Sequence, residues 1–288
     1  MRPALLAALA AVLPVAAASA QPDSLATVAL DGERRDLGAV VEAAAVADVV
    51  FLGERHDDAA AHAVQRWLLE AVHRRVGSER AVVLGLEMFE ADVQPVLDEY
   101  AAGLASEADF LEAARPWPNY ADAYRPLVEY AVSNGLGVVA TNAPARHVRL
   151  VAREGAGAFG RLPDASRTVY PPDSLAAGAS PALAAKFAEA MGGTPGHGGP
   201  ALDGMLAAQN LRDLTMAWRI AGAVRQRPGA LVVHVNGSFH SAGGLGIPEH
   251  LARLAPGLRV LVVTMEPGPA GDAPEAAPGE VIVSTRPD

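Results

Sequence analysis

Stretches of apolar residues typical of buried strands recur along the chain, and helical patterns separate them. The mostly apolar segments of strand length cover residues 49–52, 81–89, 136–140, 231–235 and 259–265. Apolar side chains at three- and four-residue steps predict helices over residues 37–47, 57–76, 92–102, 107–114, 120–133, 146–154, 201–227 and 248–254. This alternation predicts an α/β fold, with a mostly parallel sheet flanked by helices.

One internal segment and the C-terminal end depart from the alternation. Residues 155–200 are rich in Gly and Pro around one short helix over 181–191, so we expect a helical and irregular cap over a site. Residues 266–288 are expected to form a flexible tail, with 281–284 as a candidate edge strand. The α/β domain itself is therefore expected to span residues 21–265.

The first twenty residues have the layout of a secretory signal peptide. Residues 1–20 combine Arg2, an apolar run and a final Ala-Ser-Ala. The run is short, and Pro14 interrupts it, which argues against a membrane span. We therefore expect cleavage after Ala20 and an exported protein, periplasmic or otherwise extracytoplasmic, that is soluble once cleaved.

Composition excludes several kinds of site and partner. The chain has no cysteine, which excludes a disulfide framework, a thiolate metal site and a lipidated cysteine. It has 23 Lys and Arg residues and 33 Asp and Glu residues, which give a formal net charge of −10. Because contact with phosphates needs clustered cations, no nucleic acid, and so no DNA, is expected as a partner.

Two of the predicted strands end in the same polar pattern. Gly53 and His56 follow the first apolar run, and Gly237 and His240 follow the fourth. A single Gly-x-x-His turn is weak evidence for a site. Since the carboxyl ends of parallel strands meet at one edge of a sheet, the repeated pattern predicts that the two histidines lie together there.

Two glutamates accompany these histidines. Glu54 lies in the first turn, and Glu87 interrupts the apolar run 81–89. Burying a carboxylate without a partner is costly, so Glu87 is expected to face one. The partner is either the histidine pair, in a site for a divalent metal such as zinc or manganese, or an arginine such as Arg55 or Arg146.

The long helix predicted in the C-terminal half carries polar side chains on one stripe. Gln209, Asp213 and Met216 share a face by helical spacing, which indicates either a polar network against the sheet or partial exposure at a helix edge. At the start of the helix after the first strand, Asp58 is expected to cap the helix. His62, one turn further on, is expected to lie in solvent, with a position facing the site as the alternative.

Five short motifs occur in order between residues 49 and 254. The first three are Phe-Leu-Gly-Glu-Arg-His-Asp at 51–57, Gly-Leu-Glu-Met-Phe at 85–89 and Ala-Thr-Asn-Ala-Pro-Ala-Arg at 140–146. The fourth is Ala-Gln at 208–209 with Asp213 and Met-Ala at 216–217, and the fifth is Gly-Ser-Phe-His at 237–240 with Gly-Ile-Pro at 246–248. Together they resemble the ChaN-like haem-binding proteins of the Tiki superfamily, whose relatives include metal-dependent Tiki proteases and erythromycin esterase.

The resemblance implies an exported bacterial protein of haem-iron uptake, which binds haem in a homodimer that encloses stacked haems and works with an outer-membrane haem uptake system. The superfamily's paired Gly-x-x-His and its glutamate carry over to His56, Glu87 and His240, with Glu54 as a weaker match. The other residues of the motifs that we expect to line the site are Asn142, Arg146, Gln209 and Asp213. The family's haem-ligand tyrosine has no motif match here, so the ligand candidates are Tyr170, Tyr120, Tyr124 and His197. Family members are often lipoproteins, whereas this chain has no cysteine to lipidate.

Three functions are carried forward from the sequence. The first is an exported haem-binding protein in haem and iron uptake. The second is a metal-dependent hydrolase, protease or esterase-like, in which His56, Glu87 and His240 hold a metal ion that activates water. The third is an extracytoplasmic module that binds another small ligand. Whether the protein is an enzyme stays open at this point.

Overall fold

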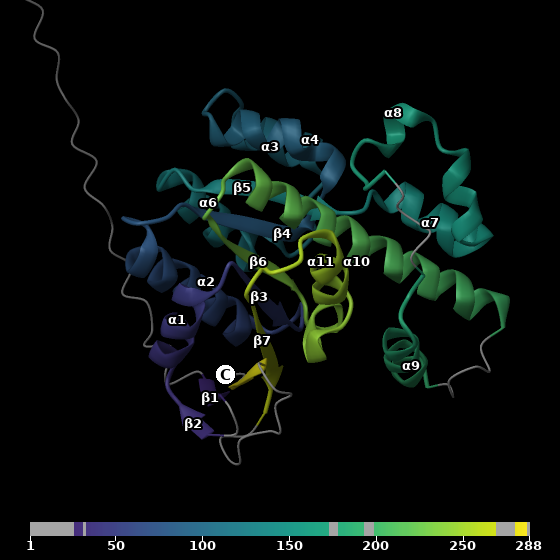
Figure 1. The fold of residues 1–288 in the computed structure, drawn as a ribbon. Coiled ribbons are helices and arrows are strands. Elements are labelled where there is room, and N and C mark those ends of the chain that lie inside the picture. Colours follow the sequence, from purple (N-terminus) through teal and green to yellow (C-terminus); the bar gives the residue numbers. More distant parts are fainter. Residues whose placement is uncertain (1–25, 31–32, 173–177, 193–198, 269–279, 287–288) are drawn as a thin grey trace, which may run out of the picture.

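The computed structural model of the protein describes residues 26–30, 33–172, 178–192, 199–268 and 280–286 (Figure 1). The signal peptide expected over residues 1–20 and the ligand candidate His197 lie outside these ranges. None of the helices within them is long and apolar enough to cross a membrane.

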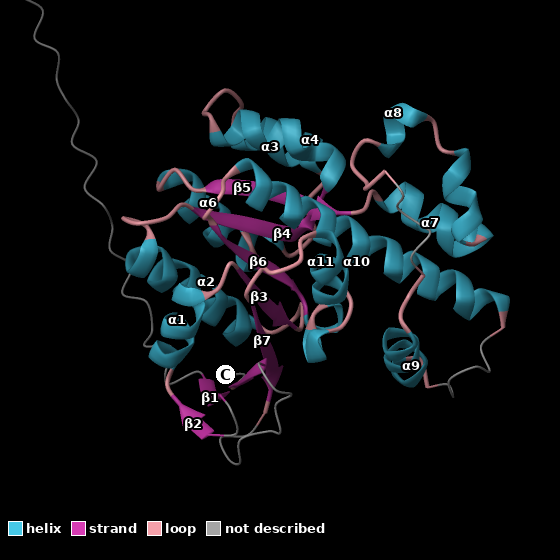
Figure 2. Ribbon diagram, viewed as in Figure 1, coloured by secondary structure: helices cyan, strands magenta, loops and turns pink. Residues whose placement is uncertain are grey.

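The fold is α/β, as predicted, with helices on both faces of a mostly parallel sheet (Figure 2). The strands are β1 (Ala26–Leu30), β2 (Glu33–Arg35), β3 (Val49–Glu54), β4 (Val82–Glu90), β5 (Gly137–Asn142), β6 (Leu231–Gly237), β7 (Val260–Pro267) and β8 (Glu280–Thr285). Their order in the sheet is β2-β1-β8-β7-β3-β6-β4-β5, and β1 and β2 run antiparallel to their neighbours.

The predicted helices begin and end within two residues of observed helices, a normal uncertainty at fraying termini. The helix predicted over 120–133 is divided in two at Tyr124, and the short helix Asp164–Arg167 was not predicted. The observed helices are α1 (Leu37–Val46), α2 (Ala59–Val76), α3 (Gln94–Ala101), α4 (Glu107–Ala114), α5 (Tyr120–Ala123), α6 (Arg125–Ser133), α7 (Ala145–Glu154), α8 (Asp164–Arg167), α9 (Pro181–Ala190), α10 (Pro200–Gln226) and α11 (Ile247–Leu254). Short 3₁₀ turns are η2 (Ala91–Val93), η3 (Ala156–Arg161), η4 (Ser238–His240) and η5 (Ala242–Gly244). Asp58 caps α2, as expected, by accepting a hydrogen bond from the Ala61 amide at 3.0 Å.

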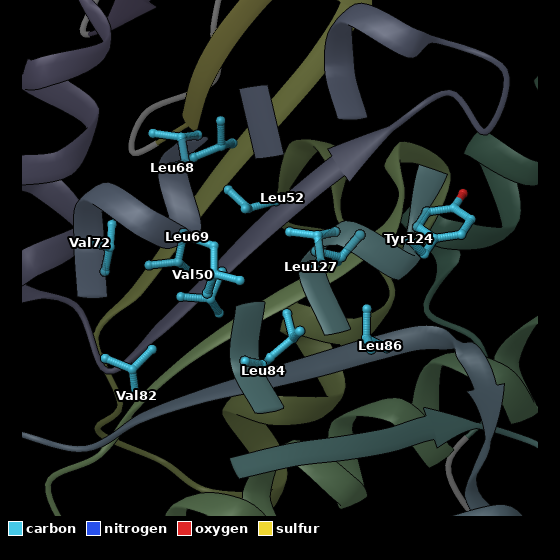
Figure 3. Packing of buried hydrophobic residues seen from close by; sticks show 14 of the residues in the cluster. Val50, Leu52, Leu68, Leu69, Val72, Val82, Leu84, Leu86, Tyr124 and Leu127 are labelled. Atoms are coloured by element: carbon cyan, nitrogen blue, oxygen red, sulfur yellow. The ribbon is translucent and has the colours of Figure 1, made fainter. Parts of the chain in front are cut away.

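Alternate side chains of the central strands fill two apolar layers, one on each face of the sheet. Val50 and Leu52 pack with α1, α2 and α6 in the larger layer, and Figure 3 shows Leu68 of α2 beside them. Val49 and Phe51 point to the other face and pack with α10 and α11. Burying each such side chain stabilises the fold by about 1.5–3 kcal/mol, and the two layers fix where the carboxyl ends of the strands lie.

The last strand is an interior strand of the sheet, so the prediction of an edge strand over 281–284 is wrong. β8 pairs with β7 on one side and with β1 on the other. Val281 and Val283 are fully buried in the larger apolar layer. β1 comes from the opposite end of the chain and covers the edge that β8 would have left open. The sheet therefore continues past the expected domain boundary at residue 265.

The cap predicted over 155–200 has more helix than expected. Within the described residues it contains η3, α8 and α9. Figure 1 shows α8 and α9 on the side of α7 and the first half of α10, away from the sheet, and η3 packs against α7. We call residues 145–172, 178–192 and 199–211 the cap lobe. Phe159 and Tyr170 of this lobe pack with Leu211 of α10 in a small apolar cluster of their own.

Candidate functional site

The carboxyl ends of β3, β4 and β6 bring the two Gly-x-x-His turns together, as the sequence predicted. β6 lies between β3 and β4, and the register places Glu54 beside Gly237. His56 follows β3, Glu87 lies near the end of β4, and His240 lies in the 3₁₀ turn after β6. Residues from distant parts of the sequence therefore share one edge of the sheet.

Glu54 is buried and contacts three side chains. Its Oε1 accepts a hydrogen bond from the Tyr124 hydroxyl at 2.6 Å and lies 3.1 Å from His56 Nδ1. Its Oε2 lies 2.7 Å from Nε2 of His62, a residue of α2. Burial raises the pKa of Glu54, but the contacts with His56 and His62 outweigh it and lower that pKa overall, so the carboxylate stays charged. The expectation that His62 lies in solvent is wrong.

Glu87 is buried in a second network on the α10 side of the site. Its Oε2 accepts a hydrogen bond from the Gly237 amide at 2.7 Å, and its Oε1 lies 3.2 Å from His240 Nε2. The other ring nitrogen of His240 contacts Asp213 and lies 2.9 Å from the Gln209 side-chain amide. Gln209 and Asp213 therefore form the polar network against the sheet that was one of the two alternatives for this helix.

The charges of this second network stabilise one another. Burial lowers the pKa of His240, but the carboxylates of Glu87 and Asp213 outweigh it and raise that pKa to about 10. Burial raises the pKa of Glu87, yet the His240 charge outweighs it and lowers that pKa to about 2. Burial dominates at Asp213 and raises its pKa. His240 is therefore a buried imidazolium at neutral pH, held between two acids.

The two networks meet at Gly237. A Cβ atom at this position would lie 2.8 Å from His56 Cε1 and 3.7 Å from Glu87 Oε2, so glycine is required for the close approach of the His56 ring. The His56 side chain is 45% exposed, in contrast to its buried partner Glu54. The hydrogen bond with Glu54 raises the pKa of His56. His56 is thus the solvent-facing titratable group of the site.

A cavity of about 480 Å³ opens above these groups, within the size range of small-molecule sites. Its lining comes from the ends of β3, β4, β5 and β6, from the connection between α4 and α5, and from α10 and the start of α7. The lining residues are His56, Glu87, Met88, Glu90, Arg115, Trp117, Asn142, Ala143, Ala145, Arg212 and His240.

Arg146 is not among the residues that line the cavity, although the sequence placed it in the site. It pairs instead with Asp92, which also lies 2.9 Å from Arg115. Arg55 lies 3.9 Å from Asp57. Neither arginine is the partner of Glu87, so the histidine alternative for that carboxylate is the one that the structure supports.

The histidines and glutamates gather without forming a recognisable metal centre. Over the described ranges, no group of three His, Cys, Asp or Glu side chains is arranged to hold a metal ion. The carboxylate oxygens of the site are already in contact with other groups. Glu54 contacts His56, His62 and Tyr124. Glu87 contacts His240 and the backbone amide of Gly237. We therefore derive no metal chemistry for this site.

The tyrosines named as haem-ligand candidates are all buried. Tyr124 is committed to Glu54, and Tyr120 packs in the core against the Phe89 and Phe110 rings. Tyr170 lies in the cap lobe, where its hydroxyl is 2.7 Å from Nδ1 of His147.

Sequence reasoning missed four residues that line the cavity, namely Glu90, Arg115, Trp117 and Arg212. It named Tyr124 only as a haem-ligand candidate and favoured a solvent position for His62, although both contact Glu54. The lining residues come from a strand end, a connection and a helix whose relative positions no local pattern encodes.

The sequence of the chain matches that of a known protein family. The sequence model of the family described as "Haem-binding uptake, Tiki superfamily, ChaN" matches residues 40–251. A curated protein of Arabidopsis thaliana, "Protein RETICULATA-RELATED 5, chloroplastic", is 27% identical over 203 residues, which are 67% of this chain. The match spans 27% of that protein's length.

Solved structures with the same fold include ChaN of Campylobacter jejuni, whose description names cofacial haem binding. It shares 15% sequence identity, and the match covers 92% of this chain and 98% of that one with a TM-score of 0.68. At this identity the likeness concerns the fold. Erythromycin esterase EreC, as a mutant in its open conformation, shares 17% identity over 87% of this chain and 78% of its own, with a TM-score of 0.41.

Proposed function

The chain belongs to the family of haem-binding uptake proteins of the Tiki superfamily that includes ChaN, and on this premise we propose that it binds haem and serves in haem-iron uptake. The observation that carries the proposal is the match of the family's sequence model to residues 40–251, which include the site strands and the cap lobe. The fold shared with a protein described as binding haem cofacially supports it.

Tyr170 is our candidate for the residue that binds the haem iron. Phenolate oxygen is an established iron ligand in haem proteins. The Tyr170 hydroxyl lies against His147, whose pKa burial and the neighbouring Arg146 lower, so that the ring is neutral at pH 7. Neutral imidazole can accept the phenol proton. Burial raises the pKa of Tyr170, so the phenol keeps its proton until a cation approaches.

The surroundings of Tyr170 also suit a porphyrin. Its ring packs edge-on against Phe159 at 4.8 Å between centroids, within the apolar cluster of the cap lobe. Since Tyr170 is only 3% exposed, iron binding would require part of the cap lobe to move away from it.

The remaining parts of the uptake proposal come from the family and from the first residues of the chain. Residues 1–20 have the layout of a signal peptide, and this supports action after export. A homodimer around stacked haems and exchange with an outer-membrane uptake system complete the proposal.

Titration of the purified protein with haemin tests it. We expect a shifted Soret band for the unaltered protein, and at least roughly tenfold weaker binding or a changed Soret maximum for Tyr170→Phe, because the iron loses its oxygen ligand. Tyr130→Phe is a matched control: the Tyr130 hydroxyl, on α6, lies 2.9 Å from Nδ1 of His73 on α2, and neither helix belongs to the cap lobe. This variant should bind haemin like the unaltered protein.

The two parts of the proposal fail separately. No Soret shift with the unaltered protein would refute haem binding. Equal affinity and identical spectra for Tyr170→Phe and Tyr130→Phe would leave haem binding in place and exclude Tyr170 as the ligand.

A further inference from the structure

Arg212 of α10 lines the cavity with its charged side chain. It is half-buried, and it makes no ion pair or hydrogen bond with any residue in the described part of the chain. The other charged side chains of the lining are paired: Arg115 with Glu90 at 2.8 Å, and His240 with Glu87. A partly desolvated guanidinium without a counter-charge costs free energy, which a bound anion would offset.

The chemistry of Arg212 selects for one kind of anion. A guanidinium presents its N–H groups in a planar fork that matches the two oxygens of a carboxylate. Asn142 adds a neutral donor to the same cavity: its Oδ1 accepts a hydrogen bond from the Ala143 amide at 2.8 Å, so its NH₂ group remains to donate to a ligand. The donors of the cavity thus fit a carboxylate end.

The rest of the lining fits an organic body attached to that end. Met88, Trp117, Ala143 and Ala145 contribute apolar atoms to the wall. The Trp117 ring stands edge-on to His56, with 4.7 Å between centroids. A volume of about 480 Å³ exceeds what a carboxylate alone would fill, and apolar walls with a few polar anchors are typical of small-molecule sites.

We propose that Arg212 anchors the carboxylate of an organic ligand in this cavity, with Asn142 as the second donor and Trp117 as part of the wall for the apolar body. Such a carboxylate has two sources, a haem propionate or a separate small organic acid. Ala143 lines the cavity and also packs in the Tyr170 cluster, so the cavity adjoins the proposed haem site. The propionate source rests on the proposed function, whereas the small-acid source does not.

Three ligands and four proteins test the proposal. Haemin, the dimethyl ester of haemin and benzoate are titrated into the unaltered protein, Arg212→Gln, Arg212→Lys and Arg149→Gln, by absorption for the porphyrins and calorimetry for benzoate. Arg149→Gln removes the same charge from an exposed position on α7 and is the matched control. Far-UV circular dichroism and thermal unfolding establish that each variant is folded.

If a propionate is the source, Arg212→Gln weakens haemin binding by roughly 10- to 100-fold, the loss expected for a charge-assisted hydrogen-bond pair, and leaves binding of the ester unchanged. If a small acid is the source, Arg212→Gln abolishes benzoate binding and leaves haemin binding unchanged. In both cases Arg212→Lys, which keeps the charge without the fork, should be intermediate, and Arg149→Gln should match the unaltered protein.

The proposal is overturned if Arg212→Gln binds haemin and benzoate as the unaltered protein does, or if the unaltered protein binds neither. A protein that fails to bind haemin but binds benzoate through Arg212 would refute haem binding and support the anchor. The failure of one proposal is thus distinguishable from the failure of the other.

Discussion

His240 lies between Glu87 and Asp213, and its positive charge is what allows two carboxylates to be buried so close together. Removing one member of such a network leaves an uncompensated buried charge, which is far more costly than removing an exposed ion pair. His56 and Glu54 form the other half of the site, but there the imidazole faces the cavity. The same residue type thus has a structural position in one turn and an accessible one in the other.

The raised pKa of His240 gives stability a defined dependence on pH. Because this pKa rises from 6.5 to about 10 on folding, the stabilisation is fully present below pH 6.5 and is lost as pH rises through 10. The unaltered protein should therefore exceed His240→Asn in free energy of unfolding by roughly 3 kcal/mol at pH 6, and this difference should shrink toward pH 10. Urea denaturation at pH 6, 8 and 10 measures it.

His250 provides the control for this pH series. Burial lowers its pKa to about 4, so the ring is neutral throughout the range tested. The curve of His250→Asn should run parallel to that of the unaltered protein between pH 8 and 10, where this ring is neutral in both the folded and the unfolded state. A His240→Asn curve that is also parallel would show that His240 is not charged in the folded protein.

The long helix α10 joins the site to the cap lobe. Its C-terminal half packs on the sheet through Met216 and Ile220, and Asp213 reaches His240 from its middle. Its N-terminal half extends past the sheet and packs against α7, as Figure 1 shows. Close packing of these two helices depends on Gly204, because a Cβ atom there would lie 2.2 Å from the carbonyl oxygen of Ala152.

Replacing each of two glycines of this helix with alanine should therefore change the free energy of unfolding in different ways. Gly204→Ala should force α7 and α10 apart and lower the free energy of unfolding by about 1–3 kcal/mol. Gly222→Ala, whose Cβ would meet only the Arg225 guanidinium at 3.8 Å, should leave it unchanged or raise it by up to about 1 kcal/mol through helix propensity. Urea denaturation measures both, and hydrogen exchange should show faster opening of α7 in Gly204→Ala alone. Equal effects of the two substitutions would contradict the packing argument.

The first and last strands of the described chain, β1 and β8, pair with each other in the sheet. β8 lies between β1 and β7, and Thr285 at its end donates a hydrogen bond to Asp58, the cap of the helix that carries His62. The C-terminal strand thus supports the site helix from outside the span matched by the family's sequence model, residues 40–251.

A chain ending at residue 268 should consequently be much less stable than one ending at residue 286. The shorter chain loses the buried side chains of Val281 and Val283 and the hydrogen bonds of β8 to both neighbours. We expect a loss of about 5 kcal/mol or more, seen as a melting temperature at least about 10 °C lower. Thermal unfolding followed by circular dichroism measures it, and equal melting temperatures would mean that β8 is not part of the stable sheet.

Local signals, namely apolar periodicity and the residues at strand ends, were enough to predict the α/β class, the order of most elements and the proximity of His56, Glu87 and His240. The surroundings of these residues follow from tertiary packing. Tyr124, His62 and Arg212 reach the site, and β8 becomes an interior strand, through packing between segments distant in sequence. Such contacts depend on how helices and strands pack in three dimensions, which no local pattern of residues specifies.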